Sequence, residues 1–117
     1  MARGKISNVD GEAAILAYKQ GDKTSLPTVT RYLLLKLSSK APGNSVEVRV
    51  PPYAVTQCIA GQNHRRGTPP NVVEMKPEIW VALALGEISW DSGIENGEIL
   101  ASGVRANISN ILPIKVN

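Results

Sequence analysis

Phenylalanine is absent from this sequence of 117 residues, whose aromatic side chains are two tryptophans and three tyrosines. A hydrophobic core must therefore be built mainly from Leu, Ile, Val and Ala, with Trp80 and Trp90 as its large rings. Hydrophobic residues still make up 43% of the chain and charged residues 20%, which is typical of a folded globular protein. The length fits one domain.

Cysteine and histidine each occur once, as Cys58 and His64. A single cysteine cannot form an internal disulfide, and the two residues fall short of the roughly four ligands of a structural zinc site. A Ser-His-Asp or Cys-His mechanism would need His64 as its base, but the adjacent Arg65 and Arg66 oppose its protonation. We therefore expect an exposed His64, a buried Cys58 thiol, no metal site and no enzymatic activity.

Long apolar runs and nucleotide-binding loops are also missing. No segment approaches the ~20 apolar residues of a membrane span, and residues 1–25 contain no stretch that resembles a secretion signal. A cytoplasmic protein without a membrane span is predicted. The glycine-rich loops that hold nucleotide phosphates are absent, so no cofactor is expected. A net charge of +3 is too small to indicate nucleic-acid binding.

Helical spacing is clearest in residues 25–40, where Val29, Leu33 and Leu37 recur every four residues before Pro42 ends the pattern. Other segments have weaker signals of the same kind. The expected helices are 10–20 with Asp10 as N-cap, 25–40 or 28–40, 77–86 with Pro77 in the first turn, a short turn over 90–96, and a last helix over 104–112 that Pro113 ends.

Strands are predicted where the apolar spacing changes to two. Val46, Val48 and Val50 alternate with charged residues, which indicates a strand with one buried face. Residues 54–59 follow Pro51-Pro52 and are expected to pair with that strand. Residues 72–75 and 98–102 complete the predicted strands, and the glycines and prolines of 60–70 indicate a loop. The fold class is α+β, with a mostly antiparallel or mixed sheet of four to five strands covered by helices.

The order of elements over residues 71–113 resembles the sterol carrier protein 2 family. A short strand leads to a helix that closes on Leu85-Gly86, a second short helix, a Gly97-x-Ile99-x-x-x-Gly103 strand and a terminal Leu helix. Upstream, APGNSVEVRVPPYAVTQC and HRRGTPPN are similar to a bacterial, single-domain branch. The resemblance implies a domain over residues 26–117, with 1–25 as an N-terminal extension that carries a short helix.

The same resemblance implies an apolar cavity between sheet and helices that holds a lipid or other apolar small molecule. Its lining would come from the sheet and from the helices, the last predicted helix included. The residues implicated are Leu33, Leu37, Val48, Val50, Ile79, Leu83, Ile108, Ile111 and Leu112. A packed core needs the same residues, so a filled interior remains an alternative.

Two further hypotheses concern the surface. His64, Arg65 and Arg66 precede Gly67 and Thr68, a combination suited to holding the anionic headgroup of an amphipathic ligand, although a solvated basic loop has the same composition. If the core is filled, the chain is instead a protein–protein interaction module, in which a free strand edge pairs with a partner or with a second copy.

Overall fold

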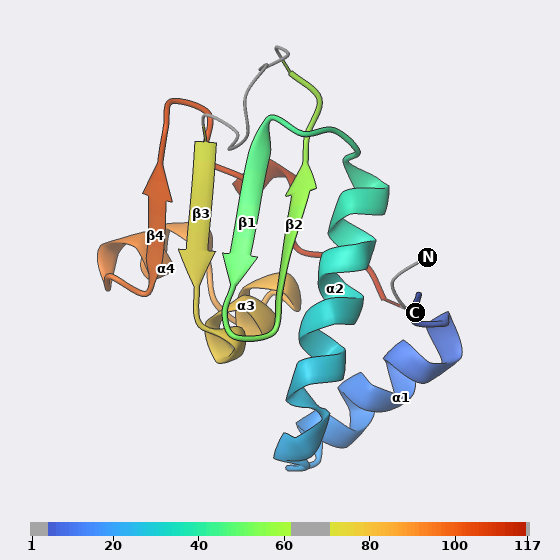
Figure 1. Ribbon diagram of the computed structural model, residues 1–117. Helices are drawn as coiled ribbons and strands as arrows, with labels where there is room; N and C mark the ends of the chain where they lie inside the picture. Colours follow the sequence, from blue (N-terminus) through green and yellow to red (C-terminus); the bar gives the residue numbers. More distant parts are fainter. Residues whose placement is uncertain (1–4, 62–70, 117) are drawn as a thin grey trace.

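The computed structural model describes residues 5–61 and 71–116, and its elements confirm the α+β class (Figure 1). Two helices come first, then three strands, two more helices and a last strand. They are α1 (Asn8–Lys19), the 3₁₀ turn η1 (Lys23–Ser25), α2 (Leu26–Lys40), β1 (Val46–Val50), β2 (Ala54–Cys58), β3 (Asn71–Met75), α3 (Pro77–Ala84), α4 (Trp90–Glu95), β4 (Ile99–Ser102) and the 3₁₀ turn η2 (Ser109–Ile111).

The four strands form one mixed sheet in the order β2-β1-β3-β4. The β1–β2 and β3–β4 pairs are antiparallel, whereas β1 and β3 run parallel. The expected pairing of β1 with β2 is confirmed, with Val46 opposite Cys58. The strand predicted over 54–59 ends one residue early because Ile59 has a positive φ of 66°, which turns the chain out of the sheet.

The helices α1 and α4 begin at residues whose side chains cap the backbone, whereas α2 and α3 have a proline in their first turn and no such cap. The predicted Asp10 cap of α1 is wrong: Ser7 is the N-cap, and its hydroxyl accepts a hydrogen bond from the Asp10 backbone N–H at 3.0 Å. Ser89 caps α4 in the same way, through the N–H of Ser92. The helix α2 begins at Leu26, directly after η1, and ends at Lys40 as predicted.

The last predicted helix, over 104–112, is wrong. Only the single 3₁₀ turn η2 forms there, and the rest of the segment has no regular structure. Helical spacing would place Val104 and Ile108 on one face, but Val104 is 99% exposed while Ile108 is fully buried. The segment is also rich in Asn, Ser and β-branched residues, all of which are weak helix formers.

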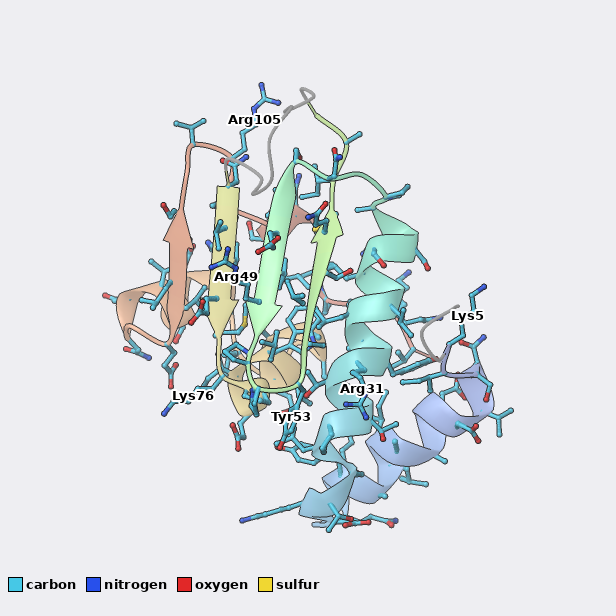
Figure 2. All side chains as sticks on the ribbon, viewed as in Figure 1. Lys5, Arg31, Arg49, Tyr53, Lys76 and Arg105 are labelled. Carbon is cyan, nitrogen blue, oxygen red and sulfur yellow. The ribbon has the colours of Figure 1, made fainter. Side chains whose placement is uncertain are left out.

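The described elements leave one face of the sheet bare. The helix α3 and the C-terminal segment lie behind the sheet and α2 runs beside β2, whereas none of them crosses in front (Figure 1). Alternate residues of β1 and β3 are accordingly buried and half-buried. Arg49 projects from the bare side (Figure 2).

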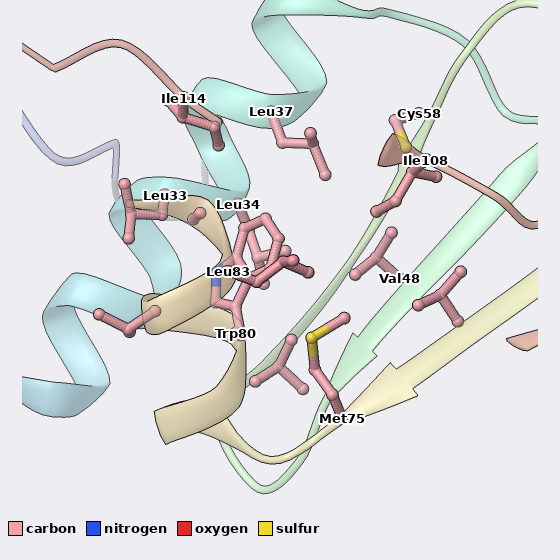
Figure 3. Close-up of a cluster of buried hydrophobic side chains, with 14 of the residues drawn as sticks. Leu33, Leu34, Leu37, Val48, Cys58, Met75, Trp80, Leu83, Ile108 and Ile114 are labelled. Carbon is pink, nitrogen blue, oxygen red and sulfur yellow. The ribbon is translucent and has the colours of Figure 1, made fainter. Parts of the chain in front are cut away.

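The core fills the space between the sheet and the helices (Figure 3). Trp80 is fully buried, and its ring N–H donates to the Thr30 carbonyl at 3.2 Å. Tyr32 is a third large ring of the core, which the sequence reading did not anticipate. Its hydroxyl donates to Asn8 of α1 at 2.9 Å, and a side chain at Gly11 would collide with its ring. The helix α1 therefore packs against α2 and contributes Ile15 to the same core.

Candidate functional site: a hollow at the α3–α4 corner

The apolar residues implicated in ligand binding divide into two groups. Six of them are at most 2% exposed and belong to the core: Leu33, Leu37, Val48, Val50, Leu83 and Ile108. Figure 3 shows members of this group from α2, α3, β1 and the C-terminal segment turned toward one another. Ile79, Ile111 and Leu112 are only partly buried and lie at the margin of that core.

The predicted headgroup residues His64, Arg65 and Arg66 lie outside the described residues. Their proximity to any apolar surface stays a prediction.

Two of the predicted lining residues meet at a surface hollow of about 450 Å³. This corner hollow lies between the end of α3, the start of α4 and the C-terminal segment. Leu83 comes from α3 and Leu112 from the C-terminal segment, so residues far apart in sequence form two walls of the hollow. The lining residues are Leu83, Gly86, Glu87, Ile88, Ser89, Trp90, Asp91, Ser109, Leu112 and Pro113.

Local backbone chemistry sets the shape of the corner hollow. Gly86 has a φ of 82°, a conformation that side-chain-bearing residues rarely adopt, and it ends α3 so that the chain can turn into α4. On the opposite wall, the Ile114 backbone N–H donates to the Ala84 carbonyl at 2.8 Å. The Lys40 ammonium donates to the Ile111 carbonyl at 3.0 Å. These contacts hold an otherwise irregular segment against the helices.

The corner hollow has an apolar floor and an acidic rim. Trp90, which is 8% exposed, and Ile88 contribute apolar surface next to Leu83 and Leu112. Glu87 and Asp91 are both exposed at the rim, and the lining includes no Lys or Arg. An anionic headgroup would therefore meet unfavourable charge here, whereas a hydroxyl could hydrogen-bond to the carboxylates.

Negative charge also acts on Tyr18, which lines a neighbouring hollow. Its pKa is raised by burial and, to a lesser extent, by the carboxylates of Glu78 and Glu87. That hollow, of about 430 Å³, is lined by Tyr18, Lys19, Gly21, Lys23, Leu26, Glu78 and Glu87. Glu87 lines both hollows, so its negative charge acts on each of them.

Ile79 borders a different hollow, of about 520 Å³, at the other end of α3. It adjoins Glu74, Lys76 and Glu98, and it opens beside Leu100 on the bare side of the sheet. The structure thus does not bring Ile79 together with Leu83 and Leu112 in one hollow. The corner hollow is the better candidate because it joins two predicted lining residues from separate elements.

Cys58 does not contribute reactive chemistry to this site. Its side chain is fully buried at the end of β2, and burial raises the pKa of the thiol to about 11. A neutral, enclosed thiol is a poor nucleophile. Within residues 5–61 and 71–116, His, Cys, Asp and Glu nowhere gather in a group of three that could hold a metal ion. None of the described helices is long and apolar enough to cross a membrane.

Sequence reasoning missed Ile88, Trp90 and Pro113 as lining residues. Trp90 was assigned to the core and Pro113 was treated only as a helix stop. A usable signal was the segment 85–91, where a glycine ends one helix and Ser89 caps the next. Two helices joined by so short a turn have their ends close together, and residues of the turn line the corner between them.

A comparison with protein families matches residues 22–114 to the model of the bacterial SCP ortholog. The match begins just before α2 and ends in the C-terminal segment, so it includes the sheet and both walls of the corner hollow. No curated protein matches the chain.

Proposed function

Because this chain belongs to the bacterial SCP ortholog family, we propose that it binds an uncharged apolar small molecule at the corner hollow without transforming it. The observation that carries the proposal is the meeting of Leu83 and Leu112 with Trp90 under a polar rim. Binding sites for small molecules commonly combine an apolar floor with a few polar groups that orient the ligand.

The size of the corner hollow suits part of a lipid-sized ligand. A volume of about 450 Å³ lies in the lower part of the range typical of ligand sites. The core beneath it is occupied by the buried residues Leu33, Leu37 and Ile108. A longer apolar tail would therefore have to displace the C-terminal segment, which lacks a strand or α-helix over residues 103–116.

The acidic rim selects among lipids. Glu87 and Asp91 repel a fatty acid carboxylate, but they can accept hydrogen bonds from a hydroxyl headgroup. A monoacylglycerol or another long-chain alcohol fits this chemistry better than a free fatty acid. An anionic ligand would instead need the cations predicted at His64, Arg65 and Arg66.

Tryptophan fluorescence tests the proposal directly. Trp90 lies in the corner hollow, whereas Trp80 is fully buried, so ligand binding should change the emission of Trp90. We expect monooleoylglycerol to give a saturable change, and native mass spectrometry to find one molecule bound per chain. Oleate at the same concentration should bind more weakly. Preference for oleate would favour the headgroup hypothesis, and binding of neither lipid would refute the proposal.

Two neighbouring residues of η2 provide a variant that blocks the corner hollow and a matched control. Ser109 lines the corner hollow and is exposed, so Ser109→Trp should fill the hollow without disturbing the core. Asn110 is equally exposed in the same 3₁₀ turn but does not line the hollow, so Asn110→Trp is the control. We expect Ser109→Trp to abolish uptake and Asn110→Trp to retain it. Equal uptake by both variants would place the ligand elsewhere.

Charge neutralisation tests the selectivity of the rim. In the double variant Glu87→Gln, Asp91→Asn, the two carboxylates become amides of similar shape. We expect oleate affinity to rise about tenfold, which corresponds to about 1.4 kcal/mol of relieved repulsion. The affinity for monooleoylglycerol should change much less, and an equal change for both lipids would mean that charge does not set the preference.

A further inference from the structure

The bare face of the sheet has an ordered pattern of charge and apolar surface. Its side chains point away from the helices and form two rows that cross all four strands. The first row reads Val55, Arg49, Glu74, Leu100 from β2 to β4, and the second reads Gln57, Glu47, Val72, Ser102. Together these eight residues are called the uncovered face.

The first row is apolar at both ends and charged in the middle. Val55 is 57% exposed and Leu100 is 64% exposed, and they lie on the two edge strands of the sheet. Between them, Arg49 and Glu74 occupy neighbouring positions of the parallel β1–β3 pair. A row with the order apolar, positive, negative, apolar is complementary to its own reverse.

We propose that the uncovered face binds a second copy of this chain through a two-fold axis parallel to the strands. Rotation about such an axis, placed between β1 and β3, reverses each row and sets it against itself. Val55 then faces Leu100 of the second copy, and Arg49 faces Glu74 of the second copy. Each contact occurs twice. The two sheets would stack about 10 Å apart with their strands nearly aligned.

The ion pair between Arg49 and Glu47 leaves Glu74 available for this contact. Arg49 donates to Glu47 at 2.6 Å, and Gln57 donates to the other Glu47 oxygen at 3.3 Å. Glu47 is therefore satisfied within its own chain. Among residues 5–61 and 71–116, the Arg49–Glu47 pair is the only ion pair, so Glu74 has no cationic partner there. The second copy supplies one.

The size of the uncovered face predicts a weak dimer. Four strands spaced about 4.8 Å apart and about five residues long cover a small area compared with a stable interface. Association should therefore be visible only at high protein concentration. Sedimentation equilibrium from about 10 µM to about 1 mM is the appropriate measurement, and we expect reversible dimerisation within that range. A wild-type chain that stays monomeric throughout would overturn the proposal.

Charge-reversal variants test the two-fold arrangement. Arg49→Glu sets like charges against each other in the symmetric dimer, and Glu74→Arg does the same with the opposite sign. We expect each variant alone to weaken dimerisation at least about tenfold. In an equimolar mixture, each variant supplies the charge that the other needs at both contacts, so a heterodimer should form. Variants that dimerise normally alone, or fail to associate when mixed, would exclude the arrangement.

The apolar ends of the row allow a second, independent mixing test. Both positions are exposed, so the substitutions should not unfold the chain. Val55→Lys and Leu100→Glu should each weaken self-association, because an unpaired charge then faces an apolar side chain. Mixed together, the introduced lysine and glutamate face each other and association should return. Lys19→Glu and Glu95→Arg make the same charge reversals as Arg49→Glu and Glu74→Arg, but at exposed helix positions, and should leave dimerisation unchanged. If these controls weaken the dimer equally, net charge rather than the uncovered face controls association.

Discussion

The two faces of the sheet place alternate residues of the same strands in opposite surroundings. On the covered face, Val46, Val48, Val50 and Val73 are all fully buried. On the uncovered face, the neighbouring positions carry Glu47, Arg49 and Glu74, with Val55 and Leu100 exposed at the edges. The backbone pairing is common to both faces, so only the side chains distinguish them.

This difference separates residues that maintain the fold from residues that are free to serve binding. A substitution on the covered face must preserve volume and apolarity, because the helices pack against it. The uncovered face carries no such restriction from the described elements. The packing of the core therefore does not require its self-complementary row, which is the basis of the proposed dimer. The corner hollow lies at the end of α3 on the covered side, so ligand binding and dimerisation can be tested separately.

The largest expected effect is a buried charge on the covered face. Val48→Asp places a carboxylate where the side chain is fully buried, and we expect a loss of more than about 4 kcal/mol in the free energy of unfolding. The same change at Val55 on the uncovered face should cost less than about 0.5 kcal/mol. Urea denaturation at micromolar protein concentration measures both. Comparable losses would show that the uncovered face is buried in solution.

A pH titration sharpens the comparison through Cys58, whose side chain packs on the covered face. Burial raises the pKa of its thiol to about 11, compared with about 9 for the exposed thiol of the unfolded chain. Between these values the unfolded chain has lost the proton that the folded chain keeps. Stability should therefore be unaffected below pH 9 and fall by up to about 3 kcal/mol as the pH approaches 11.

Cys58→Ala isolates that contribution. Tyr18, whose pKa is also raised, titrates in both proteins, so its effect cancels in the difference. We expect the wild type to lose more stability than Cys58→Ala between pH 9 and 11. Parallel pH dependences would mean that the thiol ionises as easily in the folded chain as in the unfolded one.

A smaller effect of opposite sign is expected at Thr30, on the buried side of α2. Its hydroxyl is buried and makes no hydrogen bond, although its backbone carbonyl accepts one from Trp80. Thr30→Val keeps the side-chain shape and removes the unsatisfied group, so the free energy of unfolding should rise by about 1 kcal/mol. Thr28→Val, at a half-buried position of the same helix, is the matched control and should change stability by less than about 0.5 kcal/mol. A loss of stability in Thr30→Val would indicate that the hydroxyl has a partner in solution.

Local pattern was sufficient to predict the sheet and the main helices. The alternation of valines in 46–50 located β1 and its buried face, and the prolines at 51 and 52 marked the hairpin to β2. The spacing of Val29, Leu33 and Leu37 predicted α2, with its end at Lys40. In these segments, periodicity and burial agree because each element buries a single continuous face.

The structure of the C-terminal segment could not be predicted from its sequence, for a physical reason. Its apolar residues have helical spacing, yet their burial depends on what each one meets across the core. Ile108 packs into the space beside β1 and β2, and Ile114 reaches the end of α3, while Val104 projects into solvent. The corner hollow could not be predicted for the same reason, because the C-terminal segment forms one of its walls. Sequence located Leu83 and Leu112 but could not show that they face each other.

The amino-acid sequence by itself determined which residues avoid water and where strands give way to helices. Those properties depend on side-chain polarity and on spacings of a few residues. Only the tertiary structure decided the parallel pairing of β1 with β3 and the path of residues 103–116. It also set the alignment of Arg49 and Glu74 in one row. These features arise from contacts between segments far apart in sequence, where local propensity carries no information.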